Sequence, residues 1–188
     1  MAFVVWFTGL PGAGKTTIAD VFASELERRR QVVDRLDGDV VRTHLSVGLG
    51  FSKEDRDLNV GRIAWVASRI ARAGAIVIIS AIAPYEEARR HARELISRDV
   101  PFVEVFVATP VEECVRRDPK GHYARALDGE LENFTGVSDP YEAPSAPELR
   151  LDTLDATPAE CAALVIELLE ERGLLATIPL EDVSSVPA

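Results

Sequence analysis

The first residues of chemical interest form one unbroken stretch near the N-terminus, whose spacing matches G-x-x-x-x-G-K-[ST]. Its members are Gly9, Leu10, Pro11, Gly12, Ala13, Gly14, Lys15, Thr16 and Thr17. Glycines let a backbone curl so that successive N–H groups point at phosphate oxygens, and the lysine reaches the β- and γ-phosphates. The hydroxyl of Thr16 can ligate Mg²⁺. The stretch therefore predicts a nucleoside-triphosphate site rather than an ordinary glycine-rich turn.

Two carboxylates, Asp37 and Asp39, flank a glycine directly after residues 32–36, which read as a strand. Ligands of an open parallel sheet bind at the carboxyl ends of its strands, so this pair would face the γ-phosphate. One carboxylate can hold Mg²⁺ while the other accepts a proton from an attacking hydroxyl. We expect Asp37 at the metal and Asp39 at the acceptor, a division that the spacing does not decide. A turn with a helix cap is the alternative interpretation.

Basic and aromatic residues follow the carboxylates: Arg42, Phe51, Arg56, Asn59 and Arg62. A single arginine on a helix is usually solvated surface. Together they suggest a pocket for a second anion with an aromatic face for a ring. No Asn-Lys-x-Asp sequence for reading guanine is present, which argues against a GTPase.

The chain has 188 residues and a formal net charge of −10, and 47% of its residues are hydrophobic. This length fits one α/β domain with a substantial core. Without a basic stripe, the acidic balance argues against a nucleic-acid partner. No stretch is apolar enough to span a membrane, and we expect a cytoplasmic enzyme. The two cysteines, Cys114 and Cys161, lack metal-ligand spacing and are expected to be reduced, buried thiols.

Alternating strand and helix patterns indicate how these residues are positioned. The expected strands cover residues 3–7, 32–36, 75–81, 102–107 and 149–152. The expected helices cover residues 15–30, 40–45, 52–74, 84–98 and 157–173, with a further helix capped by Thr109 and Pro110. Short connections between them imply a doubly wound P-loop NTPase fold, with a five-stranded parallel sheet and helices on both faces.

Periodicity disappears from about residue 118 to residue 147. A long aperiodic segment inside a compact domain is usually functional, and we expect it to be a lid. The kinase-like domain would then cover residues 1–175, and residues 176–188 would form a C-terminal tail.

The chain resembles the adenylylsulfate kinase family, which phosphorylates the 3′-hydroxyl of adenosine 5′-phosphosulfate with ATP. The resemblance follows the family's order over most of the chain. It is carried by residues 9–17, 36–42, 49–52, 55–59, 102–107, 117–121, 133–136 and 140–144.

The resemblance implies the following site. Lys15, Asp37 and Asp39 would be catalytic, and MgATP would be held through Thr16 and Asp37. The other ATP contacts would come from the glycine-rich stretch and from Arg117, near the ATP base. Adenylylsulfate would be bound by Asp39, Arg42, Phe51, Arg56, Asn59, Ile82, Ala83, Lys120 and Phe134. Of these, Phe51 and Phe134 would sandwich its adenine.

Two positions depart from the family pattern. Ala83 stands where the family commonly has serine, so a phosphoenzyme at that position is excluded and direct transfer from ATP remains. Gly61 replaces one arginine near the substrate. Two alternatives therefore stay open: a related kinase for another nucleotide-like anion, and a non-catalytic nucleotide-binding module. The resemblance also implies a homodimer and allows association with an ATP sulfurylase.

Overall fold

The structure is a computed structural model that describes residues 1–177, in which a five-stranded sheet forms the centre. Its strands are β1 (Val4–Thr8), β2 (Val33–Asp37), β3 (Ile76–Ser80), β4 (Phe102–Val107) and β5 (Leu149–Leu151). All pairings are parallel, and the order is β2-β3-β1-β4-β5. The predicted P-loop NTPase architecture is confirmed, and the phosphate loop follows the central strand.

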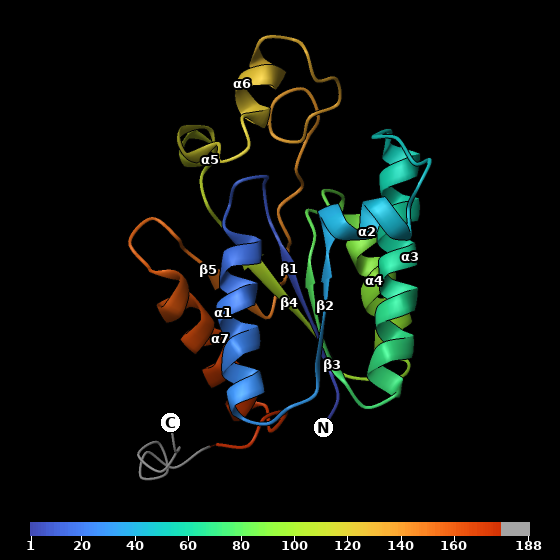
Figure 1. The fold of residues 1–188 in the computed structure, drawn as a ribbon, viewed down its shortest axis with the longest axis vertical. Helices are drawn as coiled ribbons and strands as arrows, with labels where there is room; N and C mark the ends of the chain where they lie inside the picture. The colour runs from blue at the N-terminus through green and yellow to red at the C-terminus, as the bar shows by residue number, and fades with distance from the viewer. Residues whose placement is uncertain (178–188) are drawn as a thin grey trace.

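Helices cover both faces of the sheet (Figure 1). One face carries α1 (Lys15–Arg28) and α7 (Pro158–Glu171), and the other carries α3 (Lys53–Arg72) and α4 (Glu86–Ser97). Successive strand side chains point to opposite faces, so β1 contributes to two cores. Val5 and Phe7 pack with α1 and α7, whereas Val4 and Trp6 pack with α3 and α4. This double burial explains why the strand is an unbroken apolar run.

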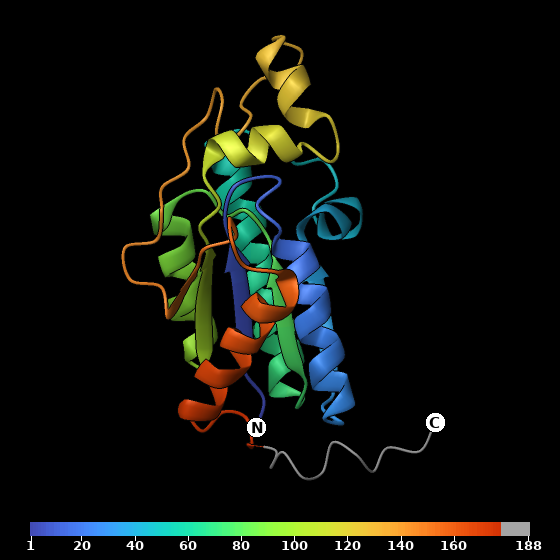
Figure 2. The same ribbon diagram turned by 90° about the vertical axis from the view of Figure 1, so that its left-hand side faces the viewer.

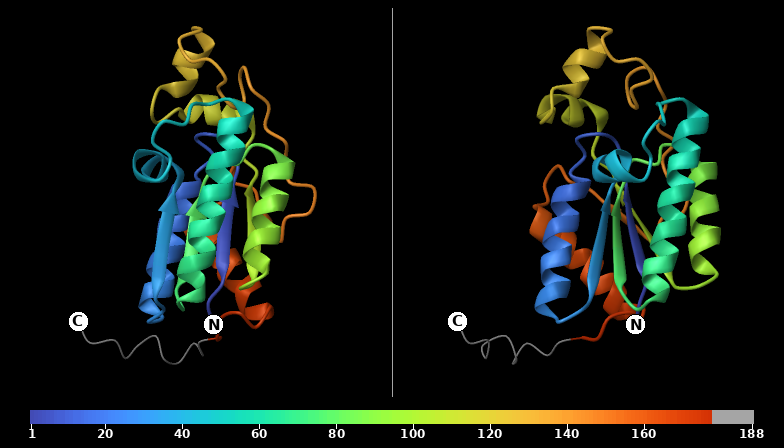
Figure 3. Two further views of the ribbon diagram at one scale, coloured as in Figure 1. Left: turned by 90° about the vertical axis from the view of Figure 1, so that its right-hand side faces the viewer. Right: turned by 45° about the vertical axis from the view of Figure 1, so that its right-hand side comes forward.

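Three short helices lie at the carboxyl end of the sheet: α2 (Gly38–His44), α5 (Val111–Arg117) and α6 (His122–Leu127). Helices α5 and α6 stand above the loop that joins β1 to α1 (Figure 2). Views from the other side show α2 and the N-terminal end of α3 at this same end of the molecule (Figure 3). Residues 118–147, the segment expected to be a lid and called the lid below, contain a helix, α6, that the sequence pattern does not reveal. Movement of this segment as a lid stays a prediction.

Helix ends show where local signals succeed. Thr157 forms a complete capping box with Glu160 and Pro158 begins the helix, as predicted. Ser52 caps α3, because its hydroxyl accepts a bond from the Asp55 N–H at 3.2 Å. The Asp55 carboxylate, however, accepts from the Gly50 N–H at 2.9 Å instead of returning to the serine. The Asp55 carboxylate therefore fixes the turn before the helix and does not complete a capping box with Ser52.

Two predicted helix starts are wrong. Thr109 does not cap α5, which begins at Val111 without a side-chain cap. The hydroxyl of buried Thr109 donates instead to the Ala13 carbonyl at 2.8 Å, so a contact with the phosphate loop replaces the local cap. Helix α4 begins at Glu86 rather than at Pro84, and Tyr85 is its N-cap.

Two further expectations concern the C-terminal tail and the absence of a membrane-spanning segment. Residues 178–188, most of the expected tail, lie outside the described residues. Within residues 1–177, every helix is too short or too polar to cross a membrane.

Candidate active site

A cavity of about 1020 Å³ opens at the carboxyl end of the sheet. Almost all sequence-predicted site residues line it: Pro11, Gly12, Ala13, Gly14, Lys15, Thr16, Thr17, Asp37, Asp39, Arg42, Phe51, Arg56, Asn59, Ile82, Ala83, Arg117, Lys120 and Phe134. Gly9 and Leu10 are not among its lining residues and act through their backbone. Residues from six separate parts of the chain thus share one cavity.

The phosphate loop is closely packed against β4. Gly9 has a φ of 151°, and a Cβ there would lie 2.5 Å from the Val107 carbonyl oxygen. The Lys15 ammonium is buried and donates to the carbonyls of Gly9 at 3.0 Å and Leu10 at 2.8 Å. Burial lowers the pKa of Lys15 to about 8. A buried ammonium in this loop is well placed to meet an anion.

Asp37 has two structural roles, one for each oxygen. Its Oδ1 accepts from the Asp39 N–H at 2.9 Å and so caps α2. Its Oδ2 accepts from the Thr16 hydroxyl at 2.9 Å. Oδ1 of Asp37 therefore acts as the helix cap that the alternative interpretation expected. Oδ2 is the oxygen that lies beside Thr16, where the magnesium site is predicted.

The Thr16 hydroxyl and the Asp37 carboxylate place two hard oxygen donors beside Lys15, a set that suits Mg²⁺. Within residues 1–177 no group of three His, Cys, Asp or Glu side chains gathers as a metal cluster. Mg²⁺ in kinase sites needs only one or two protein oxygens, because substrate phosphates and waters supply the rest. The donors present fit this ion.

Asp39 lies at the start of α2 with its carboxylate exposed toward the lid. Its Oδ2 accepts a hydrogen bond from the Lys120 ammonium. This bond raises the pKa of Lys120. The contact joins the predicted acceptor-side carboxylate to the lid, and both side chains remain mostly exposed.

Arg56 is buried at the lid's inner side. Its guanidinium donates to the Phe51 carbonyl at 2.9 Å, to the Thr135 hydroxyl at 2.8 Å and to the Asn133 carbonyl. A carboxylate of the lid, Asp139, lies 3.6 Å from its Nε. The residue predicted for substrate binding therefore also docks the lid onto α3.

Arg42 and Phe51 form an exposed edge of the cavity. The Arg42 guanidinium lies 4.4 Å from the centre of the Phe51 ring and donates to the Gly50 carbonyl at 3.0 Å. Burial, followed by the positive charge of Arg56, lowers the pKa of Arg42. Two guanidinium groups close enough to repel each other indicate a place for an anion.

Phe134 stands on the lid, and the structure reveals what holds it there. The ring of Tyr123 meets it edge-on, with centroids 5.0 Å apart. The centre of the His122 ring lies 6.2 Å from that of the same phenylalanine. Tyr123 is 1% exposed, and its hydroxyl donates to the Pro11 carbonyl at 3.1 Å. Sequence reasoning missed Tyr123, because nothing in the aperiodic segment marks one aromatic residue as buried.

The other end of the cavity includes Arg117, whose guanidinium donates to the Thr153 carbonyl at 2.9 Å and to Glu113 at 2.7 Å. Paired hydrogen bonds from Arg116 and Arg117 lower the pKa of Glu113 to about 2. These bonds fix Arg117 against the loop after β5. The predicted contact of Arg117 with the base of ATP stays a prediction.

Comparisons with known proteins identify the family of this chain. The family described as Adenylylsulphate kinase matches residues 1–152. An adenylyl-sulfate kinase of Halothermothrix orenii is 51% identical over 171 residues, covering 91% of each chain. A Mycobacterium tuberculosis APS kinase, solved with AMPPNP and APS, superposes with a TM-score of 0.88 at 43% identity, covering 90% of this chain and 98% of that one.

A longer relative, the probable bifunctional SAT/APS kinase 2 of Sorangium cellulosum, is 52% identical over 171 residues. The match covers 91% of this chain and 29% of that protein. Since the family match covers most of the chain and the relatives are about half identical, this chain belongs to the adenylylsulphate kinase family.

Proposed function

We propose that this chain transfers the γ-phosphoryl group of ATP to the 3′-hydroxyl of adenosine 5′-phosphosulfate, giving 3′-phosphoadenylyl sulfate for sulfate assimilation. The single observation that carries the proposal is the shared cavity, which joins a phosphate loop to an acceptor side. The loop contributes Lys15, and the acceptor side contributes Asp39, Arg42 and Phe51. Membership of the family supports the same reaction.

The donor side binds the triphosphate. The N–H groups of the loop and the ammonium of Lys15 would neutralise the β- and γ-phosphates. Thr16 and Asp37 would hold Mg²⁺, which when bound supplies further charge neutralisation at these phosphates. Phosphoryl transfer needs positioning and charge compensation more than strong covalent chemistry, so these groups carry much of the expected rate.

The acceptor side orients the hydroxyl. Arg42 would bind the anionic part of adenylylsulfate, and Phe51 with Phe134 would hold the adenine between them. Asp39 would accept the hydrogen bond, and then the proton, of the attacking 3′-hydroxyl. The ammonium of Lys120, which reaches Asp39 from the lid, would offset charge that develops between the two substrates.

Transfer is direct and in-line in this proposal. Ala83 offers no hydroxyl that could carry the phosphoryl group, and it lines the cavity on the acceptor side. The γ-phosphoryl group would therefore pass from ATP to the 3′-hydroxyl in one step, with ADP leaving. No covalent intermediate at this position is needed.

A coupled assay of ADP release tests the proposal, with MgATP and adenylylsulfate as substrates and AMP and other nucleotides as competing acceptors. We expect adenylylsulfate to be preferred by orders of magnitude. Asp39→Asn should lower kcat by about a hundredfold, because it removes a general base without changing shape. Asp34→Asn, an exposed carboxylate of β2, serves as the matched control. Faster turnover of a different acceptor would refute the assignment.

Three finer expectations accompany this function. We propose a homodimer, following the resemblance, and cytoplasmic localisation. Association with an ATP sulfurylase is supported by the bifunctional name of the Sorangium relative. Light scattering on the purified chain, alone and mixed with a sulfurylase, tests the two associations.

A further inference from the structure

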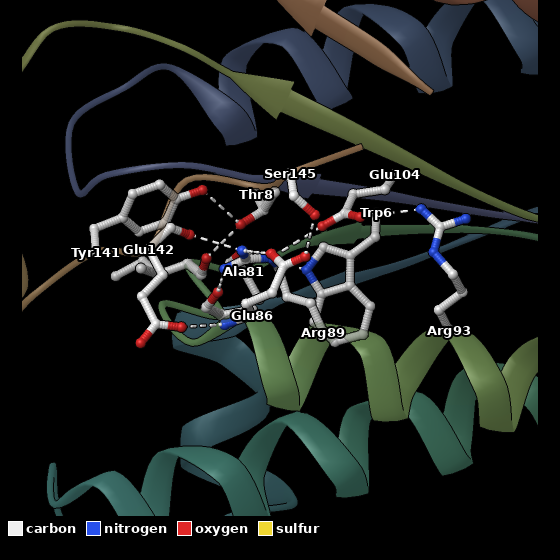
Figure 4. A network of polar contacts seen from close by, with 12 residues as sticks. Trp6, Thr8, Ala81, Glu86, Arg89, Arg93, Glu104, Tyr141, Glu142 and Ser145 are labelled. Carbon is white, nitrogen blue, oxygen red and sulfur yellow. Dashed lines mark hydrogen bonds and ion pairs between the residues drawn. The ribbon is translucent and has the colours of Figure 1, made fainter. Parts of the chain in front are cut away.

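Residues 81–84, here called the strap, lie between β3 and Tyr85, the N-cap of α4, along the wall of the cavity. Side chains of the central strand hold its first two carbonyls (Figure 4). The indole N–H of Trp6 donates to the Ala81 carbonyl at 3.3 Å, and the hydroxyl of Thr8 donates to the Ile82 carbonyl at 2.6 Å. Side chains of the buried strand β1, and not hydrogen bonds of a helix or strand, therefore hold this part of the strap in place.

The next two carbonyls are held from elsewhere. Arg89 of α4 donates through Nη1 to the Ala83 carbonyl at 2.7 Å. The Glu142 N–H, in the segment that returns from the lid, donates to the Pro84 carbonyl at 2.8 Å. Four successive carbonyls thus each accept a bond, from three different parts of the chain. Ala83 needs this support, since its φ of 44° lies in the left-handed region that a residue with a Cβ rarely adopts.

Arg89 joins the strap to the lid. Its Nη2 donates to the Glu142 carbonyl at 2.7 Å and also to the Glu86 carboxylate. The same guanidinium therefore holds both Ala83 and the returning lid segment. Its side chain is 3% exposed, so water cannot replace these bonds. A shift of Arg89 would release both segments together.

The positive charge of Arg89 is balanced by Glu104, a carboxylate of the sheet. Its Nε lies 3.0 Å from Oε1 of Glu104, a carboxylate of β4 that is 9% exposed. This N–H is not directed at the oxygen, so the contact is an ion pair rather than a hydrogen bond. The other oxygen of Glu104 accepts from Arg93 at 3.0 Å. Because both charges lose their hydration, a buried ion pair of this kind adds little to the free energy of folding. We therefore attribute to Arg89 the positioning of the segments it contacts.

Only an arginine can make this set of contacts. A planar guanidinium presents five N–H donors in a fixed fork, so it can reach two carbonyls and two carboxylates at once. A lysine would keep the charge near Glu104 but has one nitrogen at the end of a flexible stem. Arg89→Lys is therefore a substitution that keeps the ion pair and removes the bridge between the strap and the lid.

We propose that Arg89 is a positioning residue for the acceptor substrate, which acts by fixing Ala83 and the lid return at Glu142. The inference rests on the proposed function, because the strap is assigned to the adenylylsulfate side of the cavity. Arg89 touches neither substrate in this proposal. It sets the shape of the acceptor wall, which is the part of the cavity formed by the strap and the lid return at Glu142, and leaves the phosphate loop unchanged.

Arg93→Lys is the matched control, because Arg93 lies one turn further along α4 and shares Glu104 but contacts no strap carbonyl. In the ADP-release assay we expect Arg89→Lys to raise KM for adenylylsulfate at least tenfold while KM for ATP stays within twofold. Arg93→Lys should leave both values within twofold. Adding Ala83→Gly to Arg89→Lys should recover part of the lost affinity, because glycine adopts the left-handed conformation freely.

Several outcomes would overturn the inference. Equal behaviour of the two lysine variants, or an equal rise of KM for both substrates, would assign Arg89 a purely structural role. If Arg89→Lys does not fold, the charge-neutral pair Arg89→Gln with Glu104→Gln replaces it, with the same expectations. A wild-type chain that folds but does not use adenylylsulfate would refute the proposed function and this inference with it.

Discussion

Tyr123→Phe is the substitution that best tests how the lid is held over the phosphate loop. It removes one hydroxyl and leaves the ring in place. That hydroxyl donates to the Pro11 carbonyl at 3.1 Å, the direct bond between α6 and the phosphate loop. The ring, which supports Phe134 at 5.0 Å, stays packed. The substitution therefore separates the tether from the aromatic packing.

The expected effect follows from the bond that is lost. The Pro11 carbonyl loses a donor in a partly buried setting, which costs about 1 kcal/mol and makes local opening of the lid roughly fivefold more frequent. Tyr123→Leu also removes the edge-on contact with Phe134. We expect it to weaken the docked lid by about 2 kcal/mol in total, roughly a thirtyfold change in opening.

Hydrogen exchange followed by mass spectrometry measures this directly. Amides of α6 should exchange about fivefold faster in Tyr123→Phe than in the wild type, and faster still in Tyr123→Leu. Amides of residues 63–72, the C-terminal half of α3 away from Arg56, should be unchanged and serve as the internal control. Because Pro11 lies in the phosphate loop, ATP should slow exchange of the lid less in the variant. Unchanged lid exchange in Tyr123→Phe would show that the tether does not hold the lid.

Three further predictions concern the phosphate loop and α3. Because the pKa of Lys15 is about 8, its ammonium loses its proton as the pH rises above that value, and ATP affinity should fall there. Calorimetry in buffers of different ionisation enthalpy should then detect proton uptake on ATP binding at pH 8.5 but not at pH 6.5, and Lys15→Arg should abolish the uptake. Gly9→Ala should lower the free energy of unfolding by about 3 kcal/mol in denaturant melts, because its Cβ would meet the Val107 carbonyl. Gly61→Ala, in open space within α3, should instead raise it by about 1 kcal/mol. A loss of stability at Gly61, or none at Gly9, would contradict the packing described.

Local signals account for the elements that the sequence predicts well. The capping box at Thr157 and the apolar run of β1 depend on neighbours in sequence, so their structures follow from the residues themselves. Thr109 shows the limit of such signals. Its local pattern suits a helix cap, but its burial beside Ala13 offers the hydroxyl a partner that is 96 residues away in sequence. Tertiary contact overrides local preference there.

The sequence by itself determines the donor site of this protein, because a phosphate loop is built from consecutive residues whose spacing encodes its shape. It also determines the parallel sheet, since alternating strands and helices leave few other topologies. The acceptor wall is different. Only the folded chain brings Arg89 beside Ala83 and Glu142, and only there does Tyr123 meet Pro11. The contacts of Arg89 with Glu142 and of Tyr123 with Pro11 join residues that are 53 and 112 positions apart in sequence, and no periodic pattern encodes such a distance.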